Sequence, residues 1–315
     1  MNSYEKNIQI YQENEVLSPS IGNAPEKPFI DFLYGYYLDT ETEMKEQDES
    51  ELRCILLPIT KINTFKAETG TNTTVVAQDT ITCAKSMIDE GLEKVVILNF
   101  ASQDERGGGY TRGANAQEED ICRVSTLYYY LNTTMGSLFY STHGQDSYIP
   151  FEISGIPKEK LDNISYENPV IPFKLYDGYL RHHNNTVLLS ENITVFREPV
   201  TYKMLNKPYQ IDVLSCAAPI NYLKMYGDIS DPSIGMDINI IRAKIRLMLY
   251  VFKRRGYDNI VLGAWGCGAY GNDPNYVAQV FKEELARYNF KNVRFAIPGG
   301  EDSYNYRVFK SIIEA

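Results

Sequence analysis

Residues 95–128 read VVILNFASQDERGGGYTRGANAQEEDICRVSTLY, and this stretch decides the fold. Its apolar, partly β-branched start predicts a strand that is buried on both faces of a sheet. A polar loop with three consecutive glycines comes next, followed by a helical pattern from about residue 116 to residue 131. This order of strand, glycine loop and helix is typical of an α/β protein that binds its ligand at the carboxyl end of the strand.

The chain after about residue 52 repeats this alternation. Strands are predicted at 54–59, 74–77, 94–100, 186–196, 209–219, 259–265 and 292–297, and helices at 79–91, 116–131, 235–255 and 274–289, with a short helix at the end. Apolar strands between helices predict a mixed, mostly parallel sheet that is covered by helices on both faces. Right-handed crossovers would bring both glycine-rich loops of the chain to one edge of that sheet.

Two regions depart from this alternation. Residues 1–50 are polar and irregular, and we expect an N-terminal extension that is partly helical or flexible. Residues 51–315 are expected to form one α/β domain with an insertion at about 132–175, where prolines and polar residues interrupt any periodic pattern.

The composition is that of a globular protein and argues against several function classes. The chain has 315 residues, a net charge of −10, five scattered cysteines and three histidines. Without a Cys-x-x-Cys pair, neither a disulfide framework nor a zinc site is expected, so we predict a reducing location, cytoplasm or nucleus. The acidic balance argues against direct DNA binding, and the lack of an apolar run of about 18 residues argues against a membrane span.

The second glycine loop follows the strand predicted at 259–265. Residues 266–271, GCGAYG, formally match G-x-G-x-x-G. A dinucleotide-binding motif is one interpretation, but the next helix begins only at Pro274, and no acidic residue follows the next strand until Glu301. Glycines that merely make a tight turn are another interpretation. We favour a loop that holds a phosphate with backbone N–H groups, since glycines allow close approach of the main chain.

The first glycine loop, Gly107–Gly109, is not a P-loop, because no Gly-Lys-Ser/Thr follows it. Three glycines in a row cost more chain entropy than a simple turn requires, which favours close contact with a ligand. After seven further residues, Gln117–Glu119 open the predicted helix. Acidic residues are favoured in a first helical turn by the macrodipole alone, so these carboxylates have a structural explanation as well as a functional one.

The order NFAS, GGGYTRGANA and QEE closely resembles the signature of poly(ADP-ribose) glycohydrolases, in particular their microbial-type branch. That signature is a triple glycine and, after a short spacer, Gln-Glu-Glu. Further segments are similar to the same family, namely VVAQDTITCAKSMI (75–88), LLSENITVFRE (188–198) and LGAWGCGAYGNDP (262–274). The resemblance thus covers residues 60–315 in patches and leaves out the excursion after residue 132.

The resemblance implies a macrodomain-like, three-layer α/β/α sandwich, with residues 51–315 as the catalytic domain. It implies hydrolysis of the ribose–ribose O-glycosidic bonds of poly(ADP-ribose), with Glu119 as the catalytic general acid and base and Glu118 in contact with the ribose beside the scissile bond. The implied substrate-binding residues are Asn99, Gly107, Gly108, Gly109, Gln117, Gly266, Cys267, Gly268, Ala269 and Tyr270. We expect no metal and no cofactor.

One departure from the family pattern concerns the loop itself, where Glu105 and Arg106 stand in place of the usual Asn-Pro. This change bears on binding strength or linkage preference. The alternatives are a macrodomain that binds ADP-ribose without cleaving it, a hydrolase of another ADP-ribosyl linkage, and a dinucleotide-dependent oxidoreductase. The expected partner is poly(ADP-ribose) or an ADP-ribosylated protein, with no direct DNA contact and no membrane, and we expect a monomer.

Overall fold

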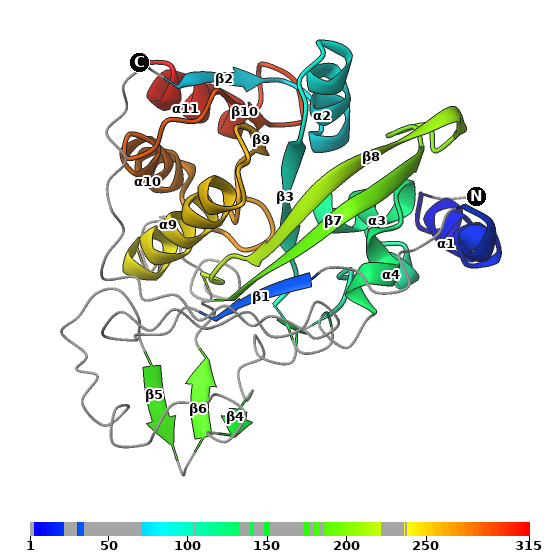
Figure 1. Ribbon diagram of the computed structural model, residues 1–315, viewed down its shortest axis with the longest axis horizontal. Helices are drawn as coiled ribbons and strands as arrows, with labels where there is room; N and C mark the ends of the chain where they lie inside the picture. Colours follow the sequence, from blue (N-terminus) through cyan, green and yellow to red (C-terminus); the bar gives the residue numbers. More distant parts are fainter. Residues whose placement is uncertain are drawn as a thin grey trace.

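The structure of the chain, a computed structural model, describes residues 3–21, 30–34, 71–103, 105–132, 136, 139–140, 148–150, 173–176, 179–182, 186–221, 236 and 238–315 (Figure 1). The strand that opens the first motif, β3 (Val95–Ala101), lies in the middle of the main sheet, and all of its residues except Phe100 are buried. Burial on both faces explains its unbroken apolar run.

Within the described residues, the main sheet has seven strands in the order β1-β7-β8-β3-β9-β10-β2. Besides β3, these are β1 (Ile30–Tyr34), β2 (Asn72–Val76), β7 (Thr186–Arg197), β8 (Met204–Ala217), β9 (Asn259–Leu262) and β10 (Asn292–Ala296). The strands from β8 to β2 run parallel, whereas β7 is antiparallel to β8 and β1 is antiparallel to β7. The predicted mixed, mostly parallel sheet is therefore confirmed.

Helices cover both faces of this sheet and complete the predicted three-layer sandwich (Figure 1). On one face lie α2 (Thr80–Asp89), α3 (Gln117–Val124) and α4 (Leu127–Leu131), and on the other α9 (Ile238–Arg254), α10 (Pro274–Leu285) and α11 (Tyr304–Ile313). Alternate residues of β3 divide between the two layers: Ile97 packs with α2 and α3, and Leu98 packs with α9 and α10.

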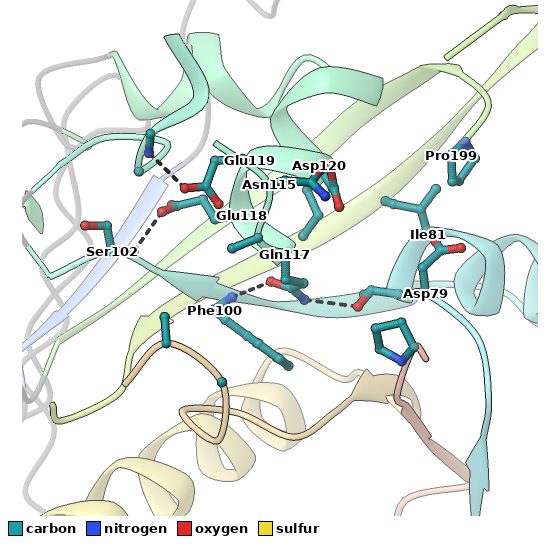
Figure 2. Close-up of a pocket in the computed structure, with 18 of the residues that line it drawn as sticks. Asp79, Ile81, Phe100, Ser102, Asn115, Gln117, Glu118, Glu119, Asp120 and Pro199 are labelled. Carbon is teal, nitrogen blue, oxygen red and sulfur yellow. Dashed lines mark hydrogen bonds between the residues drawn. The ribbon is translucent and has the colours of Figure 1, made fainter. Parts of the chain in front are cut away.

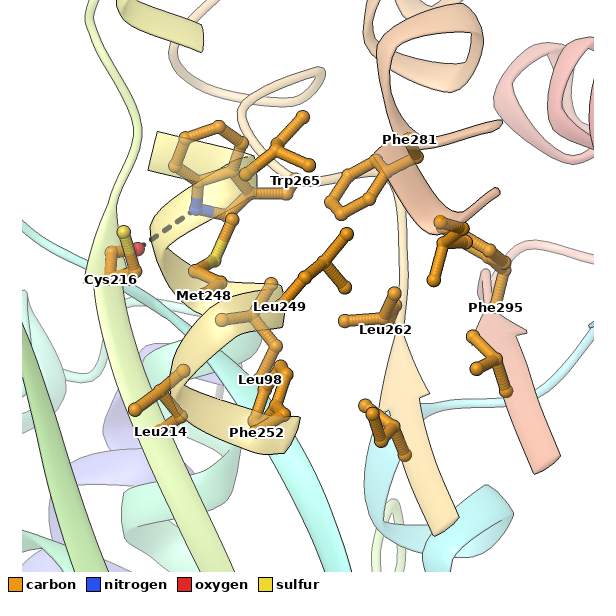
Figure 3. Close-up of a cluster of buried hydrophobic side chains, with 14 of the residues drawn as sticks. Leu98, Leu214, Cys216, Met248, Leu249, Phe252, Leu262, Trp265, Phe281 and Phe295 are labelled. Atoms are coloured by element: carbon orange, nitrogen blue, oxygen red, sulfur yellow. Dashed lines mark hydrogen bonds between the residues drawn. The ribbon is translucent and has the colours of Figure 1, made fainter. Parts of the chain in front are cut away.

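The core beneath α9 holds the one tryptophan of the chain (Figure 3). Trp265 is fully buried beside Met248 and Leu249, and its indole N–H donates to the carbonyl of Cys216 at 2.9 Å. This bond joins the start of the second glycine loop to the end of β8. The packing of Trp265 in the core therefore fixes where the second glycine loop begins.

The helix starts follow the predicted capping chemistry. Asp79 caps α2 by accepting from the backbone N–H of Thr82 at 2.8 Å, and Asp273 caps α10, whose first residue is Pro274. An aspartate at the N-cap and a proline at the first helical position satisfy the free N–H groups of the first turn. Both helices therefore begin where the sequence predicts.

The helix predicted over 116–131 is interrupted, and this expectation was wrong in detail. Ser125 is extended and bridges to Val195 of β7, and the backbone N–H of Thr126 donates to the carbonyl of Thr194 at 2.9 Å. The backbone leaves the helix to pair with the sheet, so α3 and α4 are separate. The apolar face of the helical pattern remains intact, since Ile121, Val124 and Leu131 are buried.

The predicted N-terminal extension contains α1 (Ser3–Ile21) and β1, and β1 pairs with β7 at the edge of the main sheet. The strand predicted at 54–59 lies outside the described residues. β4 (Tyr148–Pro150) lies in the predicted insertion, and it forms a small antiparallel sheet with β5 (Phe173–Tyr176) and β6 (Tyr179–His182) at and just after the end of that insertion. The domain boundaries themselves stay predictions. None of the helices found in the described parts of the chain combines the length and the apolar character that crossing a membrane requires.

Candidate active site

A cavity of about 1010 Å³ lies along the edge where the parallel strands end (Figure 2). Residues that follow the strands line it: Asp79 after β2, Ser102 after β3, Ala218 after β8, Gly266 after β9 and Ile297 after β10. Its size is at the upper end of the roughly 300–1,000 Å³ typical of small-molecule sites. Ligands of open α/β sheets bind at this edge, as the sequence predicted for the two glycine loops.

Nine of the twelve predicted site residues line this cavity. They are Gly108, Gly109, Gln117, Glu118, Glu119, Gly266, Gly268, Ala269 and Tyr270. The three others, Asn99, Gly107 and Cys267, are not part of the described lining. The structure thus brings both loops and both glutamates together, while the individual roles of these residues stay predictions.

The first glycine loop wraps closely around the start of α3. Gly107 and Gly108 have positive φ values of +69° and +56°, which L residues rarely adopt. A β carbon on Gly108 would lie 2.5 Å from Oε1 of Glu119, and one on Gly109 would lie 2.5 Å from Cβ of Ala114. Backbone conformation and lack of space therefore both require glycine here. The cost in chain entropy is explained by the close contact between the loop and the glutamates.

Glu119 faces this loop from the first turn of α3 (Figure 2). Its Oε1 accepts a hydrogen bond from the backbone N–H of Gly109 at 2.8 Å. The side chain lines the cavity although only 7% of the residue is exposed. Oε2 has no hydrogen bond to a described residue, so one carboxylate oxygen remains available to a ligand.

Glu118 is held much more tightly. Its Oε1 accepts from Asn99 Nδ2 at 3.1 Å and from the Tyr140 hydroxyl, and its Oε2 accepts from the backbone N–H of Ser102 at 2.7 Å. Burial raises the pKa of Glu118 to about 7, the three hydrogen bonds oppose that increase, and the charge of Glu119 adds to it. The two neighbouring glutamates are therefore unequal: one is fixed by three donors, and the other is partly available.

Asn99 and Gln117 support this arrangement from the sheet. Asn99 donates from Nδ2 to Glu118 and also to the Ser215 hydroxyl at 3.0 Å, which places its side chain behind the glutamate. Gln117 accepts from the backbone N–H of Phe100 at 2.7 Å and donates to the carbonyl of Leu98 at 2.7 Å. The Gln117 amide thus attaches α3 to the end of β3, in addition to any contact with a ligand.

The second glycine loop forms the opposite wall. A β carbon on Gly266 would lie 2.7 Å from Cβ of Ala218, whereas one on Gly268 would have no atom within 4 Å. Gly268 therefore presents accessible main chain to the cavity, as expected of a loop that binds phosphate. The Tyr270 hydroxyl accepts from the backbone N–H of Gln103 at 3.0 Å, which connects the two loops. Burial raises the pKa of the Cys267 thiol, so this cysteine is not an activated nucleophile.

Glu105, the first of the two residues that stand in place of the usual Asn-Pro, lines the cavity. Glu105 forms a two-pronged ion pair with Arg112, one contact of which measures 2.6 Å. The guanidinium holds the pKa of the Glu105 carboxyl below its usual range. The Glu105 carbonyl also accepts from the backbone N–H of Gly108 at 2.9 Å. In place of the missing proline, an ion pair joins the two ends of this loop.

Sequence reasoning missed the contribution of α1. Its Asn7 donates to the carbonyl of Gly113 at 3.1 Å, and its Asn14 donates to the Tyr110 hydroxyl and to the carbonyl of Arg123, both at 3.0 Å. Lys6 and Asn7 line the outer part of the cavity. Asn7, Ile10 and Asn14 follow helical spacing and are buried, but two of these three residues are polar. A search for apolar periodicity therefore does not detect this face.

One further set of lining residues was not predicted. Pro199, Val200 and Tyr202 reach the cavity from the tip of the β7–β8 hairpin, and the Tyr202 hydroxyl donates to Asp120 at 3.0 Å.

In the described part of the chain, no three His, Cys, Asp or Glu side chains gather as a metal site would require. The expectation of a reaction without metal or cofactor stays a prediction.

Comparison with known proteins agrees with this geometry. A family model described as microbial-type PARG, catalytic domain, matches residues 34–198. The structure of poly(ADP-ribose) glycohydrolase (PARG) from Thermomonospora curvata, bound to the inhibitor ADP-HPD, is 26% identical in sequence. It matches with a TM-score of 0.56 and covers 76% of this chain and 78% of that chain.

The corresponding enzyme from Deinococcus radiodurans, in complex with ADP-ribose, is 25% identical, with a TM-score of 0.59 and coverage of 79% of this chain and 86% of that chain. A sequence search of the curated proteins finds no match.

The region that the family model matches contains β3, the first glycine loop and both glutamates. Sequence signature, sheet topology and cavity therefore agree. The match over residues 34–198 spans half of the 315-residue chain. The chain belongs to the family of microbial-type poly(ADP-ribose) glycohydrolase catalytic domains.

Proposed function

We propose that this enzyme cleaves the ribose–ribose O-glycosidic bonds of poly(ADP-ribose) and releases ADP-ribose, with Glu119 as general acid and base. The observation that carries the proposal is the position of Glu119. Its carboxylate lines the cavity and receives the Gly109 N–H, yet Oε2 has no hydrogen bond to a described residue. A carboxyl group with one available oxygen can exchange a proton with a bound substrate.

The two glutamates cannot act from opposite sides of the bond, as the two carboxylates of ordinary glycosidases do. Neighbouring helical side chains point about 100° apart, so both approach the substrate from α3. Glu118 also has both of its oxygens occupied by Asn99, Tyr140 and Ser102. We therefore assign Glu118 the role of orienting the ribose beside the scissile bond.

In the first step, Glu119 donates a proton to the leaving ribose oxygen while the glycosidic bond breaks through an oxocarbenium-like transition state. Water then adds to the anomeric carbon and gives a proton back to Glu119. The exposed main chain at Gly268 would hold the diphosphate, and the Tyr270 ring would pack on the ribose next to adenine. The proton that Glu119 loses is thus replaced from water, and each turnover restores the enzyme.

The partner in this proposal is poly(ADP-ribose) itself or an ADP-ribosylated protein. The enzyme would work as a monomer in the cytoplasm or nucleus, without direct contact to DNA or a membrane. The net charge of −10 and the scattered cysteines support this view.

The decisive experiment compares the wild type with Glu119→Gln on automodified polymer. We expect the variant to lose ADP-ribose release by at least about 100-fold, the size of a typical general-acid contribution. Calorimetry with ADP-ribose should show largely preserved binding, because Gln keeps the side-chain shape. Glu93→Gln, at an exposed position away from the cavity lining, is the matched control. Undiminished turnover by Glu119→Gln would disprove the assignment.

The same assay separates this function from its alternatives. A protein that binds ADP-ribose and leaves the polymer intact would be a binding module. Release of ADP-ribose from a protein carboxylate or a nucleobase, with the polymer untouched, would indicate another linkage. A thermal shift with NAD(P)H and none with ADP-ribose would indicate an oxidoreductase.

A further inference from the structure

Tyr140 lies in the excursion after α4, where the sequence shows no readable function. Only 3% of this residue is exposed. The ring of Phe139, itself fully buried, packs edge-on against it, with ring centroids 4.9 Å apart and an interplanar angle of 90°. The phenol ring is therefore held in one orientation, and its hydroxyl group has a defined direction.

That hydroxyl lies between the two parts of the active site. It donates to Oε1 of Glu118, and the hydroxyl oxygen itself accepts a hydrogen bond from the backbone N–H of Gly107. One phenol group thus connects the first glycine loop with the first turn of α3. Because Gly107 itself does not line the cavity, this connection lies behind the wall that faces the substrate.

The surroundings of Glu118 show what this bond contributes. The groups that face its carboxylate are Asn99 from β3, the N–H of Ser102 and, on α3 itself, the carboxylate of Glu119 and the thiol of Cys122. No arginine or lysine among the described residues forms an ion pair with it. A buried carboxylate without a counter-ion stays ionised only if neutral hydrogen-bond donors stabilise its negative charge.

We propose that Tyr140 is a positioning residue that keeps Glu118 ionised and pointed at the substrate ribose. An ionised Glu118 is an acceptor for a ribose hydroxyl group, whereas a protonated one would present a donor and turn away from the N–H of Ser102. The inference rests on the proposed function, because it concerns the same site and names a residue that acts through Glu118. Tyr140 itself does not reach the cavity lining.

The test is Tyr140→Phe, which removes one oxygen and keeps the buried ring. A hydrogen bond to a charged group corresponds to about one to two pK units. We expect the acidic limb of the pH profile of kcat/KM, measured on polymer from pH 5.5 to 10, to move upward by at least about one pH unit. At the alkaline end, activity should return to within about threefold of the wild type, because Glu118 ionises there without help.

Tyr130→Phe is the matched control. Tyr130 is also buried, its hydroxyl donates to the carbonyl of Asn192 at 3.5 Å, and the neighbouring carboxylate that raises its pKa is that of Asp212. Its removal should leave the acidic limb in place. A purely structural role of Tyr140 would lower activity equally at every pH, and that result, or an unchanged profile, would overturn the proposal.

A second measurement does not depend on turnover. Calorimetry with ADP-ribose over the same pH range should show the same displacement for Tyr140→Phe. In a Glu118→Gln background, the substitution should no longer change the affinity, because its target carboxylate is gone. A persisting effect would contradict the inference. If the wild type binds ADP-ribose in this way but leaves polymer intact, the proposed function fails while the role of Tyr140 stands.

Discussion

The backbone N–H of Gly109 lies 2.8 Å from Oε1 of Glu119, so the first glycine loop and the first turn of α3 form one unit. The carboxylate takes a position that a β carbon on Gly108 would otherwise occupy. The glycines thus do more than make the loop flexible, because they leave room for the glutamate beside the main chain. This relationship leads directly to a substitution with a matched control.

Gly108→Ala should abolish activity at a moderate cost in stability. Its β carbon would lie 2.5 Å from Glu119 Oε1 at a φ of +56°, so the carboxylate must move. The left-handed conformation alone should lower the free energy of unfolding by about 1–2 kcal/mol. Gly91→Ala, at a φ of +82° with nothing within 4 Å, carries the same strain without the contact. We expect comparable melting temperatures for the two variants, and a kcat/KM loss confined to Gly108→Ala.

The raised pKa of Glu118 predicts how stability depends on pH. Its pKa is about 7 in the folded protein, above the value of 4.5 of a free glutamate. Between these values the unfolded chain binds fewer protons than the folded one, so Glu118 makes stability fall as pH rises. Taking the difference in unfolding free energy between the wild type and Glu118→Gln removes the contributions of the other titratable groups, because both proteins share them. We expect this difference to shift by about 2–3 kcal/mol in favour of the variant from pH 5 to pH 8. If this difference does not change with pH, the pKa of the buried Glu118 carboxyl is not raised.

Asn14→Ala should detach α1 from the first loop. Asn14 donates to Tyr110 and Arg123, and its Oδ1 accepts from Arg197 Nε at 2.9 Å. Loss of three buried hydrogen bonds should lower the free energy of unfolding by about 2–3 kcal/mol. Gln9→Ala is the control on the same helix, since Gln9 is exposed and donates to Glu13 one turn further along α1. Chemical denaturation checks the first effect, and faster hydrogen exchange over residues 3–21 checks the detachment. Equal stabilities of the two variants would contradict the anchoring role.

The parts of the fold that could be predicted from the sequence are those with a local cause. The apolar run of β3 reports burial on both faces, and Asp79 and Asp273 cap the helices that they precede. Both glycine loops lie at the same sheet edge because parallel strands end there. The family signature places Glu118 and Glu119 beside the first of these loops, and the structure brings them together.

The features that could not be predicted depend on contacts between distant residues. The break at Ser125 arises because Thr126 pairs with Thr194 of β7, although the helical pattern continues through it. Asn14 is buried by hydrogen bonds to residues about a hundred positions away. The bond from Tyr140 to Glu118 joins a segment without periodicity to α3. Each of these features depends on tertiary hydrogen bonds, which local propensity does not report.

The Glu105–Arg112 ion pair predicts a modest, salt-dependent effect on the loop. Both side chains are about half exposed, so water screens their attraction and their coupling should be small. A double-mutant cycle with Glu105→Gln and Arg112→Gln, measured as ADP-ribose affinity, isolates that coupling. It should decrease when the salt concentration rises from 0.05 M to 0.5 M, because added ions screen exposed charges. A coupling of zero at low salt would show that the pair does not replace the missing proline.

Tyr270→Phe tests whether the two loops act together on the ligand. The Tyr270 hydroxyl accepts from the N–H of Gln103 at 3.0 Å and lies 3.5 Å from the carbonyl of Ala101, while its ring lines the cavity. The substitution keeps the ring that would pack on the ribose and removes the link to the end of β3. The loss of one hydrogen bond should weaken ADP-ribose binding by about 3- to 10-fold. Calorimetry measures this, with Tyr276→Phe as the control, since the Tyr276 side chain on α10 is exposed. If Tyr270→Phe binds as tightly as the wild type, ring packing alone defines the position of Tyr270, and the link between the loops has no part in recognition.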